Sequence, residues 1–107
     1  MDGLSERMDD VKVVVMCRDG AASPQLRREQ LSAHRDYVDS HASVLVLSGP
    51  LVGDDGQDRT GQFYVLDVPE LETARRFVDD DPFTRAGIFA EVTVEEFITV
   101  FRDGARV

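Results

Sequence analysis

The chain has 107 residues, of which 42% are hydrophobic and 31% charged, a composition typical of one globular domain. Its 12 lysines and arginines stand against 21 aspartates and glutamates, which gives a formal net charge of −9. This balance argues against a nucleic-acid partner and against a membrane surface, because both attract clustered positive charge. No apolar run reaches the roughly 18 residues that are needed to cross a bilayer.

The ends of the chain and its cysteine usage indicate a simple organisation. We predict a flexible acidic leader over residues 1–10, one domain over residues 11–101 and a loose tail over residues 102–107, with Met8 as an alternative start. The leader lacks the basic and apolar regions of a signal peptide. The single cysteine, Cys17, cannot form an internal disulfide, and no Cys/His spacing typical of a metal site occurs. We therefore expect a cytoplasmic protein with no metal and no cofactor.

The first half of the domain predicts a strand, a helix and a second strand. Residues 11–17 (VKVVVMC) are rich in β-branched side chains and are largely apolar on both faces of a strand. Ser23, which a proline follows, suits the N-cap of a helix that runs to about Ser40. Residues 44–47 (VLVL) predict the second strand, and residues 48–50 (SGP) predict the turn that ends it.

The second half predicts the same types of element in the order strand, helix, strand. Residues 63–68 (FYVLDV) predict a strand that forms an antiparallel hairpin with the second strand. Pro69 starts a second helix, which ends where Asp81 precedes a proline, and Asp81 then caps a short further helix. Residues 88–101 predict the last strand, with a β-bulge where the alternation slips at residues 95–96.

The order β-α-β-β-α-β predicts an α+β, ferredoxin-like fold. In that fold a four-stranded antiparallel sheet carries two helices on one face. The other face is left uncovered, although the first and third strands carry apolar side chains on both faces. An uncovered apolar face of this size usually marks an interface. We therefore expect a homodimer in which two sheets pack face to face.

His34 is the strongest candidate for chemistry. It shares a helical face with Leu31 and Val38, so its imidazole points toward the apolar side of the helix. An imidazole titrates near neutral pH and can act as an acid or a base, but it can also be a packed core side chain. Asp81 has a similar pair of interpretations, since it can orient an imidazole or only cap a helix.

Other residues also leave two interpretations open. Tyr37, one turn beyond His34, lines either a pocket or plain surface. Gly49 and Pro50 either bring the backbone close to a ligand or end a strand. Cys17 continues the inward face of the first strand, which favours a buried small hydrophobic side chain.

These residues carry a resemblance to the YCII-related (YciI-like) family that covers residues 11–101. Its markers are the strand VKVVVMC, the histidine in LSAHRDYV, the segment SGPL and the segment DDDPFTRAGIF followed by a strand. The resemblance implies a dimeric α/β barrel built on the ferredoxin-like fold. It also implies an active-site pair of histidine and aspartate, which by position are His34 and Asp81.

The resemblance further implies cofactor-free acid–base chemistry on a small molecule. The family includes an enzyme that eliminates chloride from a chlorinated hydroxyquinol, so we expect elimination or isomerisation of a small cyclic or enolisable substrate by a lyase or isomerase. The residues expected to bind that substrate are Gly49, Pro50, Tyr37, Phe83 and Arg85. The alternatives are a non-catalytic dimer that binds a small ligand or a partner, and a haem-binding or aromatic-oxidising relative.

One departure from the family pattern concerns an arginine. Many relatives place an arginine shortly before the histidine, whereas here Leu-Ser-Ala precedes His34. The cations that remain as candidates to bind a substrate anion are Arg27, Arg28 and Arg85.

Overall fold

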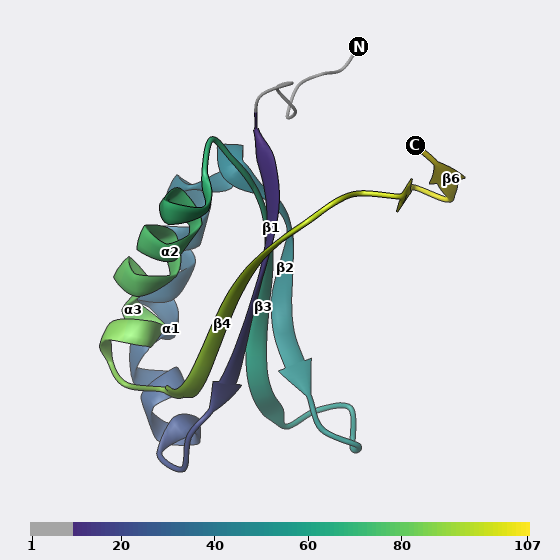
Figure 1. Ribbon diagram of the computed structural model, residues 1–107. Coiled ribbons are helices and arrows are strands. Elements are labelled where there is room, and N and C mark those ends of the chain that lie inside the picture. The colour runs from purple at the N-terminus through teal and green to yellow at the C-terminus, as the bar shows by residue number, and fades with distance from the viewer. Residues whose placement is uncertain (1–9) are drawn as a thin grey trace.

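The computed structural model describes residues 10–107 and has a four-stranded antiparallel sheet of order β2-β3-β1-β4 (Figure 1). The strands of this sheet are β1 (Val11–Asp19), β2 (Leu45–Val52), β3 (Arg59–Val68) and β4 (Phe89–Phe97). The helices are α1 (Ser23–Ser40), α2 (Leu71–Asp80), α3 (Pro82–Arg85) and the 3-10 helix η1 (Ala42–Val44). Figure 1 shows the helices on one side of the sheet. The predicted ferredoxin-like order is confirmed, while the predicted leader lies outside the described residues except for Asp10.

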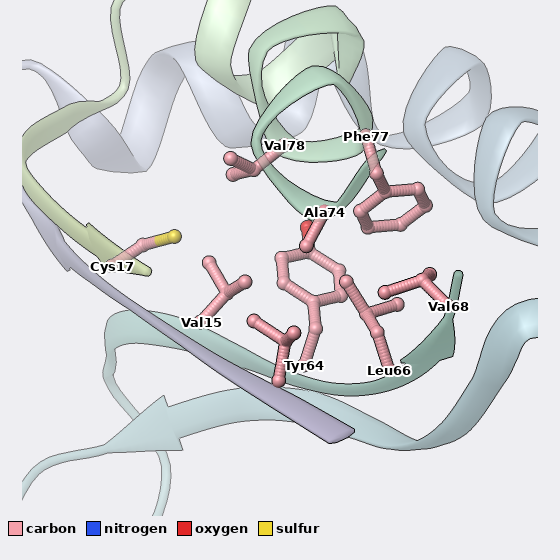
Figure 2. Close-up of a cluster of buried hydrophobic side chains, with 9 residues drawn as sticks. Val15, Cys17, Tyr64, Leu66, Val68, Ala74, Phe77 and Val78 are labelled. Carbon is pink, nitrogen blue, oxygen red and sulfur yellow. The ribbon is translucent and has the colours of Figure 1, made fainter. Parts of the chain in front are cut away.

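The core fills the space between the sheet and α2 (Figure 2). Alternation along β1 and β3 turns every second side chain toward the helices. The buried members are Val13, Val15, Cys17, Tyr64, Leu66, Val68, Ala74, Phe77 and Val78. Burial of each larger aliphatic or aromatic side chain contributes about 1.5–3 kcal/mol, so this layer dominates the stability of the domain. The expected burial of Cys17 is confirmed.

The central strands approach each other very closely at Gly61. A Cβ atom at this position would lie 2.2 Å from the carbonyl oxygen of Cys17 on β1. Only glycine fits such a contact, so the residue fixes how near β3 can come to β1 at this end of the sheet.

Two predictions about the first half of the chain are wrong. Residues 48–50 do not end the second strand, because β2 continues to Val52, with Pro50 opposite Gln62. A proline is tolerated there because β2 is an edge strand. Ser23 is not the N-cap of α1 either: Ala22 occupies that position, and the Ser23 hydroxyl donates a hydrogen bond to the carboxylate of Asp19 instead.

The last strand also differs from its prediction. It ends at Phe97, and the expected bulge at residues 95–96 is wrong, since Glu95 and Glu96 pair regularly with Val14 and Val13 of β1. The irregularity lies instead at the start of β4, where its register with β1 shifts between Arg18 and Asp19 of β1. The alternation slip in the sequence therefore reflects exposed glutamates at a sheet edge, not an extra residue.

The residues after Phe97 form a separate hairpin rather than a longer strand and a loose tail. Strand β5 (Phe101–Arg102) pairs with β6 (Ala105–Arg106). The two residues between them, Asp103 and Gly104, have φ angles of 53° and 80°. Positive φ at both central positions is the geometry of a tight hairpin turn, for which Asp-Gly is a preferred sequence. We call residues 98–107 the C-terminal arm.

The sheet face opposite the helices is apolar at its centre. The register places Val14 beside Val65, and Val65 beside Leu47. One pair further along, Met16 lies beside Phe63. These five side chains, which we call the open-face patch, are half-buried or exposed. The expectation of an uncovered apolar face is therefore confirmed. No helix in residues 10–107 is long and apolar enough to cross a membrane.

Candidate active site

His34 and Asp81 meet between α1 and the junction of α2 and α3. The imidazole Nδ1 of His34 lies 2.8 Å from Oδ1 of Asp81, although the two residues are 47 positions apart in the chain. Asp81 is fully buried, and His34 retains 7% of its exposure. The Pro82 ring ends α2 at this point and starts α3, which turns the Asp81 side chain inward, toward α1.

Asp81 accepts three hydrogen bonds. Besides His34, the backbone N–H of Phe83 donates to Oδ1 over 2.9 Å, which is the N-cap of α3. The hydroxyl of Tyr64 donates to Oδ2. The two interpretations that the sequence left open, a cap and a partner for histidine, are therefore both true. A carboxylate held by three donors keeps a fixed orientation, and it can hold one tautomer of the imidazole.

Tyr64 is the site residue that sequence reasoning missed. Burial, together with the negative charge of Asp81, raises the pKa of its hydroxyl far above the usual range, so it stays a hydrogen-bond donor. The alternation in residues 63–68 was a usable signal, because it places Tyr64 on the inward face of β3 with Leu66. A buried tyrosine hydroxyl almost always needs a partner.

Phe83 packs flat on the imidazole. The two ring centres are 3.8 Å apart and the planes differ by 1°. The guanidinium carbon of Arg27, about two turns earlier on α1, lies 5.0 Å from the centre of the same phenyl ring. Phe83 therefore sits between Arg27 and His34 and limits how the imidazole can turn.

Arg27 is itself held in place. Its Nε lies 2.7 Å from Asp19 and its Nη2 donates to the carbonyl of Gly61 over 2.8 Å. This nearly buried ion pair ties the start of α1 to β1 and β3. An arginine whose donors are occupied in this way stabilises the fold and has few donors left for a substrate anion. Of the three arginines considered, Arg27 is therefore the weaker candidate to bind that anion.

The second nitrogen of the imidazole is left open. Within residues 10–107, Nε2 of His34 has no hydrogen-bond partner, and it is not among the fully enclosed polar atoms that lack one. In the neutral imidazole whose proton lies on Nδ1 and is directed at Asp81, Nε2 carries the lone pair. The arrangement can therefore accept a proton at one narrow, solvent-reachable point.

The remaining predicted residues lie apart from this cluster. Arg85 is exposed and its Nη2 lies 2.8 Å from Asp80. Tyr37 donates its hydroxyl to the carbonyl of Phe77. Gly49 and Pro50 lie on the edge strand β2, and within the described residues no hydrogen bond joins them to His34 or Asp81. Of the predicted set, the structure brings together His34, Asp81 and Phe83.

A large hollow on the described surface does not open on this cluster. It has a volume of about 890 Å³ and lies between the start of α1 and the connection from β2 to β3. Its cationic side chains are those of Arg27, Arg28 and Arg59, and His34 is not part of its lining.

Other chemistry has little support in the described residues. No group of three potential metal ligands occurs among residues 10–107. Burial raises the pKa of the Cys17 thiol to about 12, an effect to which the charge of Asp81 adds. A thiol that is protonated at neutral pH is a poor nucleophile.

The family model of the YCII-related domain matches residues 11–98. The chain belongs to the YCII-related domain family. Protein YciI of Escherichia coli O6:H1 is 30% identical over 95 residues, which are 82% of this chain and 97% of that protein. The resemblance that the sequence indicated is confirmed.

Solved structures of similar shape agree with membership of the YCII-related family. The 5-chloro-2-hydroxyhydroquinone dehydrochlorinase TftG of Burkholderia phenoliruptrix AC1100, in complex with 2,5-dihydroxybenzoquinone, is 30% identical with a TM-score of 0.74. The match covers 81% of this chain and 93% of that one. An antibiotic biosynthesis monooxygenase is 15% identical with a TM-score of 0.53, covering 84% and 98%, and supports the fold alone. These neighbours are of the dimeric α/β-barrel type, and they agree with the ferredoxin-like α+β fold of this chain.

Proposed function

We propose that this YCII-related protein is a cofactor-free enzyme in which His34 exchanges a proton with a small cyclic or enolisable substrate. The observation that carries the proposal is the buried hydrogen bond between His34 and Asp81, with Nε2 free of any hydrogen-bond partner among residues 10–107. The likeness to TftG, which is a dehydrochlorinase in complex with a dihydroxybenzoquinone, supports a hydroxylated ring as the substrate class.

The proposed reaction starts at Nε2. This nitrogen takes the proton of an acidic hydroxyl or of a carbon beside a carbonyl, and the imidazole becomes a cation. Asp81, which already accepts the Nδ1 proton, stabilises that cation. Isomerisation requires only that the proton return at another atom of the substrate. Elimination instead requires that the electron pair of the broken O–H or C–H bond form a new double bond while chloride leaves the ring with its own bonding pair, and that the imidazolium then release its proton to water.

Phe83 and Arg85 are proposed as substrate contacts. Phe83 covers one face of the imidazole and is itself buried, whereas Arg85 is exposed and lies two residues further on, at the end of α3. Tyr37, Gly49 and Pro50 stay predictions from the sequence.

The test measures chloride release from 5-chloro-2-hydroxyhydroquinone. We expect His34→Ala to lose at least about 100-fold in rate, because a placed base typically supplies 10²–10⁴-fold. Asp81→Asn should lose rate as well, while His41→Ala, at the end of the same helix, should retain it. A His34→Ala protein with full turnover would remove the histidine from the mechanism.

A second candidate function is a non-catalytic module that binds a small anion. The observation in its favour is that a hollow of about 890 Å³ is lined by Arg28 and Arg59 and not by His34. The two candidates separate in a titration with 2,5-dihydroxybenzoquinone. A binding module loses affinity in Arg28→Ala and shows no turnover of the chlorinated substrate, whereas the enzyme keeps affinity and loses turnover in His34→Ala.

We also propose that the protein is a homodimer that buries the open-face patch. The support is the apolar centre of the uncovered sheet face and the dimeric barrel type of the structural neighbours. Two such faces packed together remove apolar surface from water on both copies.

A further inference from the structure

The two oxygens of the Asp81 carboxylate are held by different parts of the fold. Oδ1 faces the imidazole Nδ1 of His34 and accepts the backbone N–H of Phe83. Oδ2 accepts the hydroxyl of Tyr64, and within residues 10–107 it has no other donor. Rotation of a carboxylate about its Cβ–Cγ bond is soft. The Tyr64 hydroxyl therefore fixes the plane of the carboxylate, and with it the direction of Oδ1.

Tyr64 is placed so that it can act only through Asp81. It is fully buried in the core, so it cannot contact a substrate. Figure 2 shows its ring rising from β3 toward α2, and the ring packs edge-on against Phe77 with the ring centres 5.1 Å apart. Burial, together with the negative charge of Asp81, raises the pKa of the hydroxyl, so it keeps its proton and donates it to the carboxylate.

Other titratable groups near the carboxylate do not replace this donor. Burial raises the pKa of the Cys17 thiol on β1 to about 12, with a contribution from the charge of Asp81. A protonated thiol is only a weak donor, and among the described residues Cys17 makes no hydrogen bond to Asp81. Arg27 on α1 is paired with Asp19. The second oxygen of Asp81 therefore depends on one hydroxyl.

Loss of the Tyr64 hydroxyl would leave Oδ2 of Asp81 buried without a donor. A buried charged oxygen in that state is costly. Two responses relieve the cost, because the carboxylate can turn away from Nδ1 of His34 or take up a proton. In both cases the imidazole loses its fixed acceptor at Nδ1, and its own proton can move to Nε2. An imidazole with its proton on Nε2 has no lone pair there and cannot act as the proposed base.

We infer that Tyr64 is a positioning residue of the proposed reaction, which through Asp81 keeps the imidazole proton of His34 on Nδ1 and leaves Nε2 free to accept another. Tyr64 thus adds a member from β3 to a pair that the helical side of the fold supplies. The effect on rate rests on the proposed function, whereas the effect on the imidazole can be measured without a substrate.

The first test is nitrogen NMR of the imidazole at about pH 8.5, above the ordinary titration range of histidine. The shifts of the two ring nitrogens report which one carries the proton, and His34→Ala identifies the signals, since His41 is the other histidine. We expect Nδ1 alone to be protonated in the wild-type protein and a mixture of tautomers in Tyr64→Phe. Tyr37→Phe is the matched control, because its hydroxyl donates to a backbone carbonyl of α2, and the His34 signals should not change.

Two outcomes of this NMR test would contradict the role of Tyr64. The same single tautomer in Tyr64→Phe as in the wild-type protein would show that the hydroxyl only satisfies its own hydrogen bond. A wild-type imidazole of His34 with its proton on Nε2 would overturn the proposed function as well. Tyr64→Phe keeps the ring and its packing on Phe77, and circular dichroism checks that the variant is folded.

The second test measures kcat and KM for chloride release from 5-chloro-2-hydroxyhydroquinone. Tyr64→Phe should lose at least about tenfold in kcat, with KM changed by less than about twofold, because the residue does not touch the substrate. In an Asp81→Asn background the same substitution should have little further effect, since Tyr64 acts through that carboxylate. Equal losses in both backgrounds overturn the role of Tyr64 alone. An inactive wild-type protein overturns the proposed function, and the NMR result then decides whether Tyr64 holds the tautomer.

Discussion

Asp81 concentrates the chemistry of this protein in one buried side chain. A fully buried carboxylate without donors would cost several kcal/mol, and here His34, Tyr64 and the backbone of Phe83 supply them. The same donors make the side chain rigid. A residue that caps α3 for stability thus also presents a fixed acceptor to the imidazole.

Two buried groups that can lose a proton, the thiol of Cys17 and the hydroxyl of Tyr64, make the free energy of unfolding decrease at alkaline pH. Burial raises the pKa of the Cys17 thiol from 9.0 to about 12, and it also raises the pKa of Tyr64. A raised folded-state pKa means that the folded protein holds its proton longer than the unfolded chain does. The associated stability is complete below the unfolded pKa and is lost as the pH rises through the interval up to the folded pKa.

We therefore expect the free energy of unfolding to fall between about pH 8 and about pH 10, with the thiol contributing roughly 1 kcal/mol of the fall. Urea unfolding at the two pH values measures it. In Cys17→Ala the fall should be smaller by that amount, while the tyrosine contribution persists. An equal fall in both proteins would show that the thiol does not remain protonated in the folded state.

At the scale of elements, the sequence predicted what depends on local pattern. The β-branched run in residues 11–17 and the Asp-Pro break at Asp81 each have a local physical cause, and both are found in the structure. The predictions that were wrong concern features that depend on neighbouring elements in space. Whether residues 48–50 end a strand depends on β2 being an edge, and Ser23 lost its cap role because Asp19 of another element accepts its hydroxyl.

The site residues also fall into those that the sequence predicted and those that only tertiary packing brings together. His34 and Asp81 could be proposed from one family motif each, and helix periodicity already turned His34 inward. Tyr64 lies on a strand between them in sequence. Its hydroxyl reaches the Asp81 carboxylate only because of how α2 packs on β3. The stacking of Phe83 between Arg27 and His34 is likewise set by the packing of α3 on α1, which no local pattern encodes.

The close approach of β1 and β3 gives a prediction about one element. Gly61→Ala places a Cβ atom 2.2 Å from a backbone oxygen of β1, and neither strand can move without breaking the ladder. We expect it to lower the free energy of unfolding by about 3 kcal/mol or to prevent folding. Gly49→Ala is the control, since its Cβ meets only the Phe63 ring at 3.8 Å. Urea unfolding of the two variants should differ clearly, and equal stability would mean that the strands are further apart than described.

At the scale of the whole molecule, an acidic domain of 107 residues leaves one sheet face to be covered. A domain this small buries only about two thirds of its unfolded surface, so covering the open-face patch adds stability that the single chain lacks. If two copies provide that cover, unfolding and dissociation are the same event. The free energy of unfolding then depends on protein concentration, as it does for any dimer that binds only in its folded form.

Each tenfold rise in concentration should add about 1.4 kcal/mol per dimer and raise the Tm by about 3 °C. Differential scanning calorimetry over two decades of concentration measures the slope. Leu47→Asp puts a charge in the centre of the open-face patch and should abolish the slope, while Leu31→Asp, on the helical side, should preserve it. A Tm independent of concentration in the wild-type protein would mean that the uncovered face is not a dimer interface.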